Sequence, residues 1–163
     1  MLLKNQNTSQ ISKKADISKK SKIGKNCKIW HNVQIRENTN IGINCVISKD
    51  VYIDKNVSIG NNTKIQNAAQ IYNGVNIGKN VFIGPGVVFT NDKFPRANNK
   101  NWKITKTIIE DGVSIGANST IICGVRIEKN AMIGAGSVVT KNIKKNSLYF
   151  GNPAKFIKKI WIY

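Results

Sequence analysis

Few residues of this chain have side chains suited to acid–base chemistry, and His31 is the only histidine. An imidazole has an ordinary pKa of about 6.5, so it can accept a proton near neutral pH and act as a general base. The alternative is that His31 only packs or forms a hydrogen bond. The three cysteines, an odd number without a Cys-x-x-Cys pair, favour a reducing, cytosolic setting.

The elements that must position such groups are indicated by a repeat of six residues. An aliphatic or aromatic residue recurs at every sixth position from Ile11 to Phe89 and again from Ile109 to Val139. A strict period of six fits neither a helix nor a plain strand, whereas a short strand followed by a tight corner explains it. The 26 Ile against 3 Leu and 8 Ala also favour strands over helices.

Residues that tolerate a positive backbone φ mark the corners. Of the eighteen positions three residues after an anchor, from Asn26 to Asn142, seventeen are Asn, Asp or Gly. The exception, Ala68, predicts either a strained corner or a different turn. A second period sets the number of corners in a coil, because glycine follows the anchor in steps of 18 residues at Gly24, Gly42, Gly60 and Gly78.

Three hexads per coil predict a triangular prism of stacked parallel strands with isoleucine inside. We expect a lead-in at 1–10, the prism at 11–143 and a short tail at 144–163. A protruding loop is expected at about 91–107, where the step from Phe89 to Ile109 is two residues longer than one coil. Such loops often carry recognition groups, and the alternative is a harmless insertion. Cys27 and Cys45 should be wall neighbours and small core residues rather than a disulfide.

The repeat resembles the left-handed parallel β-helix of the hexapeptide-repeat acyltransferases, which implies an all-β fold. Seven blocks resemble, in order, the nucleotide-linked 3-amino-sugar N-acetyltransferases. They are Ile29–His31, Lys64–Asn67, Val88–Ala97, Gly116–Asn118, Cys123–Val125, Gly134–Lys141 and Gly151–Lys155. This resemblance implies a homotrimer with active sites between subunits, and acetyl-CoA as co-substrate without a metal.

The implied reaction is attack of a sugar amine on the thioester carbon of acetyl-CoA through a tetrahedral oxyanion. Asn91 resembles the family residue beside the sugar amine; its amide can orient that amine but cannot be a base. Asp92 could attract the ammonium form or accept its proton, and the alternative is that it is only a corner acid. His31 is the third catalytic candidate, although the departing CoA thiolate could itself take the proton.

The resemblance also implies two sets of binding residues. The expected substrate-binding residues are Gln66, Asn67, Tyr72 and Arg96, while Ala68 replaces an Asn that the family usually carries. Small residues would let the CoA amides approach the backbone, and lysines could meet its phosphates or simply form a solvated basic tail. The expected cofactor-binding residues are Gly116, Ala117, Gly134, Ala135, Lys141, Lys155 and Lys158.

The residue after Asn91 suggests the substrate branch. An Asp at this position resembles the enzymes that use dTDP-3-amino-3,6-dideoxyhexoses, which supply precursors for bacterial surface glycans. Relatives that use UDP-linked 3-amino-uronic sugars tend to carry an apolar residue there, and this class is the alternative substrate.

Other functions fit the composition less well. The net charge of +18 would suit nucleic acid, but only three of the 26 cations are arginine, so we expect no nucleic-acid partner. Codon bias toward A/T also explains many Ile, Lys and Asn residues. A zinc site of three imidazoles would need three histidine positions. No apolar run of 18 residues occurs, and segment 156–162 is expected to pack on the trimer rather than insert stably in a membrane.

Overall fold

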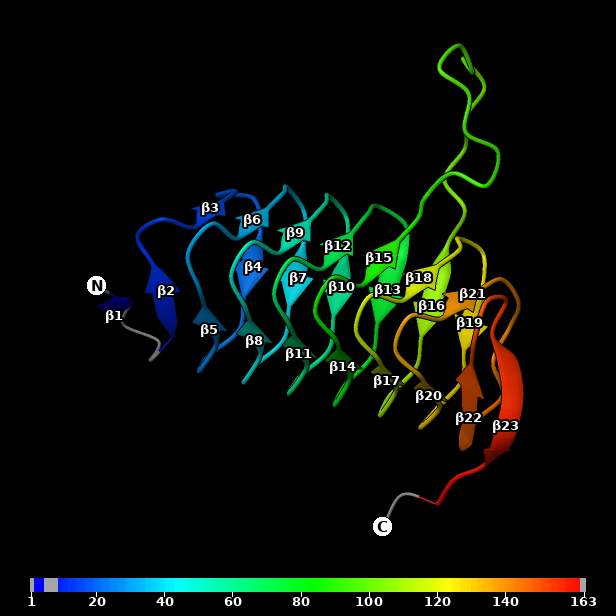
Figure 1. Ribbon diagram of the computed structural model, residues 1–163. Coiled ribbons are helices and arrows are strands. Elements are labelled where there is room, and N and C mark those ends of the chain that lie inside the picture. Colours follow the sequence, from blue (N-terminus) through cyan, green and yellow to red (C-terminus); the bar gives the residue numbers. More distant parts are fainter. Residues whose placement is uncertain (1, 5–8, 162–163) are drawn as a thin grey trace.

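The computed structural model describes residues 2–4 and 9–161 of the chain. In these ranges the protein is an elongated solenoid of short strands and contains no helix (Figure 1). The parallel strands form three sheets, and successive strands of the chain enter the three sheets in turn. The predicted all-β prism with three hexads per coil is therefore confirmed, in agreement with a left-handed parallel β-helix.

The three sheets are called A, B and C. Sheet A contains β1 (Leu2–Lys4), β2 (Gln10–Ser12), β5 (Lys28–Ile29), β8 (Val46–Ile47), β11 (Lys64–Ile65), β14 (Phe82–Ile83), β17 (Ser114–Ile115), β20 (Met132–Ile133), β22 (Ser147–Phe150) and β23 (Lys155–Lys159). Sheet B contains β3 (Asp16–Ile17), β6 (Gln34–Ile35), β9 (Tyr52–Ile53), β12 (Gln70–Ile71), β15 (Val88–Phe89), β18 (Thr120–Ile121) and β21 (Val138–Val139). Sheet C contains β4 (Lys22–Ile23), β7 (Asn40–Ile41), β10 (Ser58–Ile59), β13 (Val75–Ile77), β16 (Thr107–Ile109) and β19 (Arg126–Ile127).

The core is a stack of the anchor residues, and its register follows the 18-residue period. Ile29 lies opposite Ile47, and Ile47 lies opposite Ile65, on parallel neighbouring strands of sheet A. These three side chains are at most 1% exposed. Burying an isoleucine contributes about 1.5–3 kcal/mol, so the repeated anchors supply much of the driving force for folding.

The corners take the predicted left-handed conformation at sixteen of the eighteen positions, Ala68 included with a φ of 59°. The expectation was wrong for Asp92 and Asn142, because the chain leaves the regular coil there. The Asp92 carboxylate instead accepts a hydrogen bond from the Phe94 backbone N–H at 2.9 Å. The Asn142 side-chain oxygen accepts one from the backbone N–H of Arg126 at 2.8 Å.

Ala68→Asn is expected to stabilise the protein by about 1 kcal/mol, because a left-handed backbone costs an ordinary L-residue about 1–2 kcal/mol and costs Asn less. Urea unfolding monitored by circular dichroism measures this change. Ala135→Asn is the matched control, since Ala135 is also exposed and is not among the residues with positive φ. A gain that is equal in both variants would contradict strain at Ala68.

The cysteines lie in the wall as predicted, and all three are free and buried. The Cys27 thiol donates a hydrogen bond to the carbonyl of Gly42 at 3.1 Å, and the Cys45 thiol donates to Gly60 at 3.3 Å, one coil further. The hydrogen bond with Cys27 and burial raise the pKa of the Cys45 thiol. These thiols therefore act as small core residues.

Two features depart from the regular coils. Residues 90–106, between β15 and β16, form no strand and project from the solenoid (Figure 1). At the C-terminal end, β23 pairs antiparallel with β22 and forms the edge of sheet A. Residues 1 and 5–8 of the predicted lead-in and 162–163 of the tail lie outside the described ranges. The described residues contain no helix that is long and apolar enough to span a membrane.

Candidate functional site

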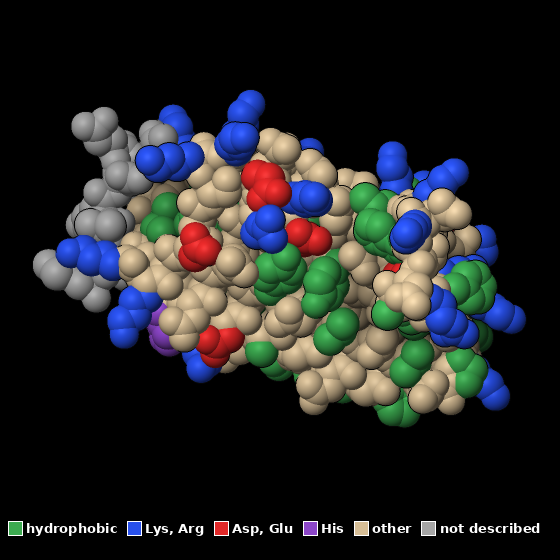
Figure 2. Space-filling view, turned by 90° about the horizontal axis from the view of Figure 1, so that it is seen from above, with side chains coloured by type: hydrophobic (Ala, Val, Ile, Leu, Met, Phe, Trp, Pro, Cys, Tyr) green, Lys and Arg blue, Asp and Glu red, His purple; other side chains and the backbone are tan. Residues whose placement is uncertain are grey.

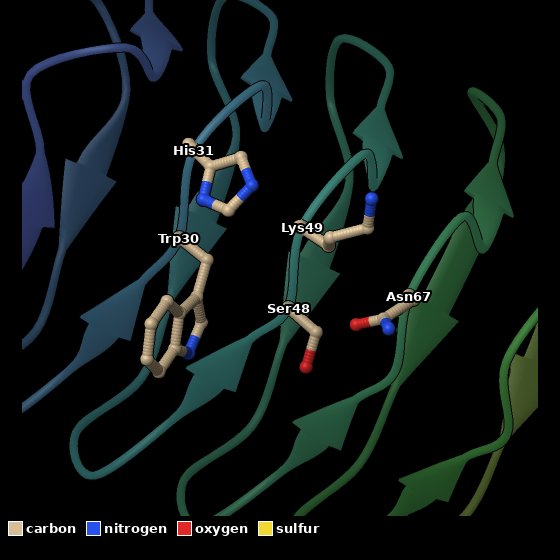
Figure 3. A pocket seen from close by; sticks show the side chains of 5 residues that line it. All are labelled: Trp30, His31, Ser48, Lys49 and Asn67. Carbon is tan, nitrogen blue, oxygen red and sulfur yellow. The ribbon is translucent and has the colours of Figure 1, made fainter.

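The corner between sheets A and B gathers polar side chains from successive coils, and we call it the A–B edge. His31 follows β5, Lys49 follows β8 and Asn67 follows β11, each at the same place in its hexad. Together with Trp30 and Ser48 they line a pocket of about 370 Å³. Figure 3 shows these side chains on three neighbouring coils, with His31 and Lys49 on one side of the pocket and Trp30 and Ser48 on the other.

A carboxylate lies beside this pocket and is held by two partners. The Lys49 ammonium is 2.8 Å from Oδ2 of Asp50, and the Asn32 amide donates a hydrogen bond to Oδ1 at 3.0 Å. These contacts, that of Lys49 first, lower the pKa of Asp50, and the charge of a protonated His31 acts in the same direction. The Asp50 backbone N–H also donates a hydrogen bond to the carbonyl of His31 at 3.3 Å, so the two residues lie on neighbouring coils of this edge.

A second cavity of about 410 Å³ adjoins the first toward the N-terminal end. It is lined by Ser12, Lys13, Lys14 and His31. His31 lines both cavities, so the two are neighbours along the A–B edge. Figure 2, which looks onto sheet B, shows the one histidine side chain at the margin of this face with basic side chains next to it.

The same edge becomes smooth toward the C-terminal end, where small residues replace the long side chains. A Cβ added to Gly84 would lie 2.7 Å from the backbone nitrogen of Ala117, so no side chain fits there. The predicted cofactor residues Gly116, Ala117, Gly134 and Ala135 follow β17 and β20 on this edge. The backbone atoms that exclude a Cβ at Gly84 and Gly116 belong to the next coil, so stacking of the coils requires these glycines. At Gly134 the ring of Phe150 lies in the corresponding place.

Gln66 and Asn67, which follow β11, thus share the A–B edge with His31 and the cofactor glycines. Lys155 and Lys158 lie on β23 at the end of sheet A, and both are exposed. Lys141 follows β21 and belongs to the next corner, between sheets B and C.

The structure does not bring Asn91 and Asp92 next to His31 within one chain. They follow β15 at the corner between sheets B and C, which we call the B–C edge. Their coil is three coils away from that of His31, about 14 Å along the axis at about 4.8 Å per coil. Arg96 is exposed in the projecting loop, where its guanidinium donates a hydrogen bond to the carbonyl of Pro95 at 2.9 Å.

Tyr72 also lies on the B–C edge, one coil before Asn91. Its ring is tilted by 55° against that of Tyr52, with the ring centroids 5.5 Å apart. The Tyr52 hydroxyl contacts the Asp54 carboxylate at 3.2 Å. Burial, and then the charge of Asp54, raise the pKa of Tyr52.

Sequence reasoning missed Lys49, Asp50 and the roles of Trp30 and Ser48 in the pocket. The signal was present, because a step of 18 residues from His31 leads to Lys49 and then to Asn67. The same step from Trp30 leads to Ser48 and then to Gln66. Among the described residues, no cluster of three or more His, Cys, Asp or Glu side chains could hold a metal ion.

The chain is similar in sequence to known transferases over part of its length. It is 54% identical over 50 residues to the dTDP-3-amino-3,6-dideoxy-alpha-D-galactopyranose 3-N-acetyltransferase of Aneurinibacillus thermoaerophilus. These 50 residues are 31% of this chain and 26% of that protein. The first three curated relatives are matched over only 12% to 26% of their own length. The sequence match is therefore a partial one.

Solved structures share the fold over nearly the whole chain. PerB from Caulobacter crescentus, in complex with CoA and GDP-perosamine, superposes with a TM-score of 0.60 at 19% identity, covering 92% of this chain and 57% of PerB. A point mutant of AntD, an N-acyltransferase from Bacillus cereus in complex with dTDP and coenzyme A, gives 0.57 at 22% identity, covering 94% and 81%. At this identity the likeness shows the fold alone.

Two family models match the repeat itself. The model of the bacterial transferase hexapeptide matches residues 32–67 and 56–91, and the model of the hexapeptide repeat of succinyl-transferase matches residues 106–141. Together these matches cover more than half of the chain, and they fall on the regular coils either side of the projecting loop. The chain therefore belongs to the hexapeptide-repeat family of bacterial transferases.

Proposed function

We propose that this protein is a CoA-dependent N-acetyltransferase that acetylates the amine of a nucleotide-linked amino sugar. The observation that carries the proposal is the A–B edge, which joins the pocket lined by His31 to a run of short side chains at Gly116, Ala117, Gly134 and Ala135. The partial match to a sugar 3-N-acetyltransferase supports the same activity. Because acetyl-CoA and nucleotide sugars are cytoplasmic metabolites, the proposed reaction belongs in the cytoplasm.

In the proposed reaction, the neutral amine attacks the thioester carbonyl carbon, and a C–N bond forms as the carbonyl oxygen becomes an oxyanion. When this intermediate collapses, the C–S bond breaks and the CoA thiolate leaves. The proton of the substituted amine passes to His31, which acts as the general base. The imidazolium then gives this proton to the thiolate, which leaves an amide, free CoA and His31 ready for the next turnover.

Asn91, Asp92 and Arg96 enter this proposal from a second copy of the chain. They lie on the B–C edge and in the projecting loop, away from His31 of the same chain. We propose a homotrimer in which the loop of one prism reaches the A–B edge of its neighbour. Light scattering is then expected to give three times the 18.1 kDa of one chain, and a stable monomer at micromolar concentration would contradict this assembly.

The activity is tested by incubating the purified protein with acetyl-CoA and a panel of dTDP- and UDP-linked amino sugars, while a thiol reagent measures CoA release. We expect rapid release with a dTDP-3-amino-3,6-dideoxyhexose and none with the corresponding 3-hydroxy sugar. Release at the rate of acetyl-CoA alone with every amine would overturn the proposed function. Release that is fastest with a UDP-linked 3-amino-uronic sugar would keep the activity and reject the dTDP assignment.

Asp92 provides a prediction about this substrate preference. A carboxylate near C6 of the sugar repels a uronic acid and tolerates a methyl group, so Asp92→Val is expected to narrow the preference for the dTDP-deoxyhexose. Because the Asp92 carboxylate also holds the N–H of Phe94, Asp92→Asn is the matched control that keeps this acceptor and removes the charge. Ratios of kcat/KM for the two substrates measure the effect. An unchanged ratio in Asp92→Asn would place the carboxylate away from the sugar.

A further inference from the structure

The N-terminal half of the A–B edge exposes an aromatic ring in a basic groove. Trp30 is 45% exposed, whereas tryptophan is largely buried in most proteins. The ring borders the 370 Å³ pocket, and His31 lines both this pocket and the neighbouring 410 Å³ cavity. The two cavities together, from Ser12 to Asn67, involve four successive coils, or about 14 Å along the axis, and we call them the Trp30 groove.

The charge in the Trp30 groove favours an anion. Lys13, Lys14 and Lys49 line the two cavities, and none of the described lining residues is acidic. The nearby carboxylate of Asp50 is already paired with Lys49 at 2.8 Å and bonded by Asn32. Lysine ammonium groups bind phosphate oxygens through charge-assisted hydrogen bonds. An exposed indole can stack on the ring of any nucleobase.

We propose that the Trp30 groove binds the nucleoside diphosphate part of the sugar substrate. The base stacks on Trp30, and the phosphates pair with Lys49. The positive charges of Lys13 and Lys14 attract the phosphates as well. The identity of the ligand rests on the proposed function, whereas the place of binding rests on the groove. The amino sugar then lies in the rest of the 370 Å³ pocket, which His31 and Asn67 both line, and the C-terminal half of the same edge is left for CoA.

The test uses dTDP as the probe, titrated into the full chain in an isothermal calorimeter at low salt. Trp30→Ala is expected to weaken dTDP binding at least tenfold, and Trp30→Phe should keep most of the affinity because it retains a stacking ring. Lys13→Gln with Lys14→Gln is expected to weaken binding at least fivefold. The matched control is Lys19→Gln with Lys20→Gln, which removes the same charge from exposed positions on the B–C edge of the same coil and should change the affinity less than twofold.

One further variant is expected to improve binding. Asp50→Asn removes the carboxylate beside Lys49, keeps a side chain suited to the corner φ of 60°, and retains the oxygen that accepts from Asn32. We expect dTDP to bind two to five times more tightly to Asp50→Asn, with the gain shrinking as salt is added. Unchanged or weaker binding would count against phosphates lying near Lys49.

The proposal can fail separately from the proposed function. If the wild-type chain acetylates a nucleotide sugar while dTDP binds equally to all variants, the groove assignment is overturned and the activity stands. If the chain binds dTDP in the groove but acetylates none of the panel, the groove stands and the activity falls. The affinity for CoA is measured in parallel. Loss of CoA binding in Trp30→Ala, with dTDP binding unchanged, would assign the groove to the adenosine of CoA and overturn the proposal.

Discussion

His31→Asn is expected to lower kcat for acetyl transfer by about 10²- to 10⁴-fold, the range that a general base contributes. The imidazole lines both cavities of the groove, so it lies where the proposed substrate binds. Asn keeps a polar side chain that tolerates the corner but cannot accept a proton. Because His31 is exposed, the free energy of unfolding should change little. Steady-state kinetics together with urea unfolding measure both quantities.

Lys25→Asn is the matched control for this experiment. Lys25 has the same hexad position as His31 but lies at the corner between sheets C and A, and it is exposed. We expect its kcat to equal that of the wild type. A loss below about tenfold in His31→Asn would assign His31 to positioning and leave the CoA thiolate as the acceptor of the proton.

Asn91→Ala is expected to lower kcat about 100-fold, because a misplacement of the reacting amine by about 1 Å costs a factor of this order. Asn91 is half-buried at the start of the projecting loop and does not belong to the core, so stability should be retained. Asn98→Ala, in the exposed part of the same loop, is the control and should keep full activity. An unchanged kcat in Asn91→Ala, with intact substrate binding, would move the amine away from this residue.

The regular part of the fold could be predicted from local chemistry. The period of six fixes which side chains point inward, and Asn, Asp or Gly three residues later fixes the corners, so each coil repeats the same information. Ala68 has a positive φ although alanine disfavours this conformation, because regular coils lie on either side of the corner. Asp92 and Asn142 do not have a positive φ, because no regular hexad follows either of them and the left-handed turn is not required.

The site could be predicted only in part. The 18-residue step places His31 and Asn67 on one edge, and the same step would have added Lys49, which lies halfway between them in the sequence. Asn91 and Asp92 are separated from that edge by the width of sheet B. The period of a sequence predicts which edge of one prism a residue occupies. It does not predict which edges of two prisms contact each other in an oligomer, because that contact depends on the whole surface of each prism.

Mixing the two inactive variants tests most directly whether one active site joins His31 of one chain to Asn91 of its neighbour. His31→Asn and Asn91→Ala chains are co-expressed with different tags, and the oligomers that carry both tags are purified. If each site takes one residue from each of two chains, a mixed trimer has both residues intact in about a third of its sites. Acetyl transfer at roughly that fraction of the wild-type rate, far above either variant alone, is the result that we predict. Mixed oligomers no more active than the average of the two variants would contradict a shared site.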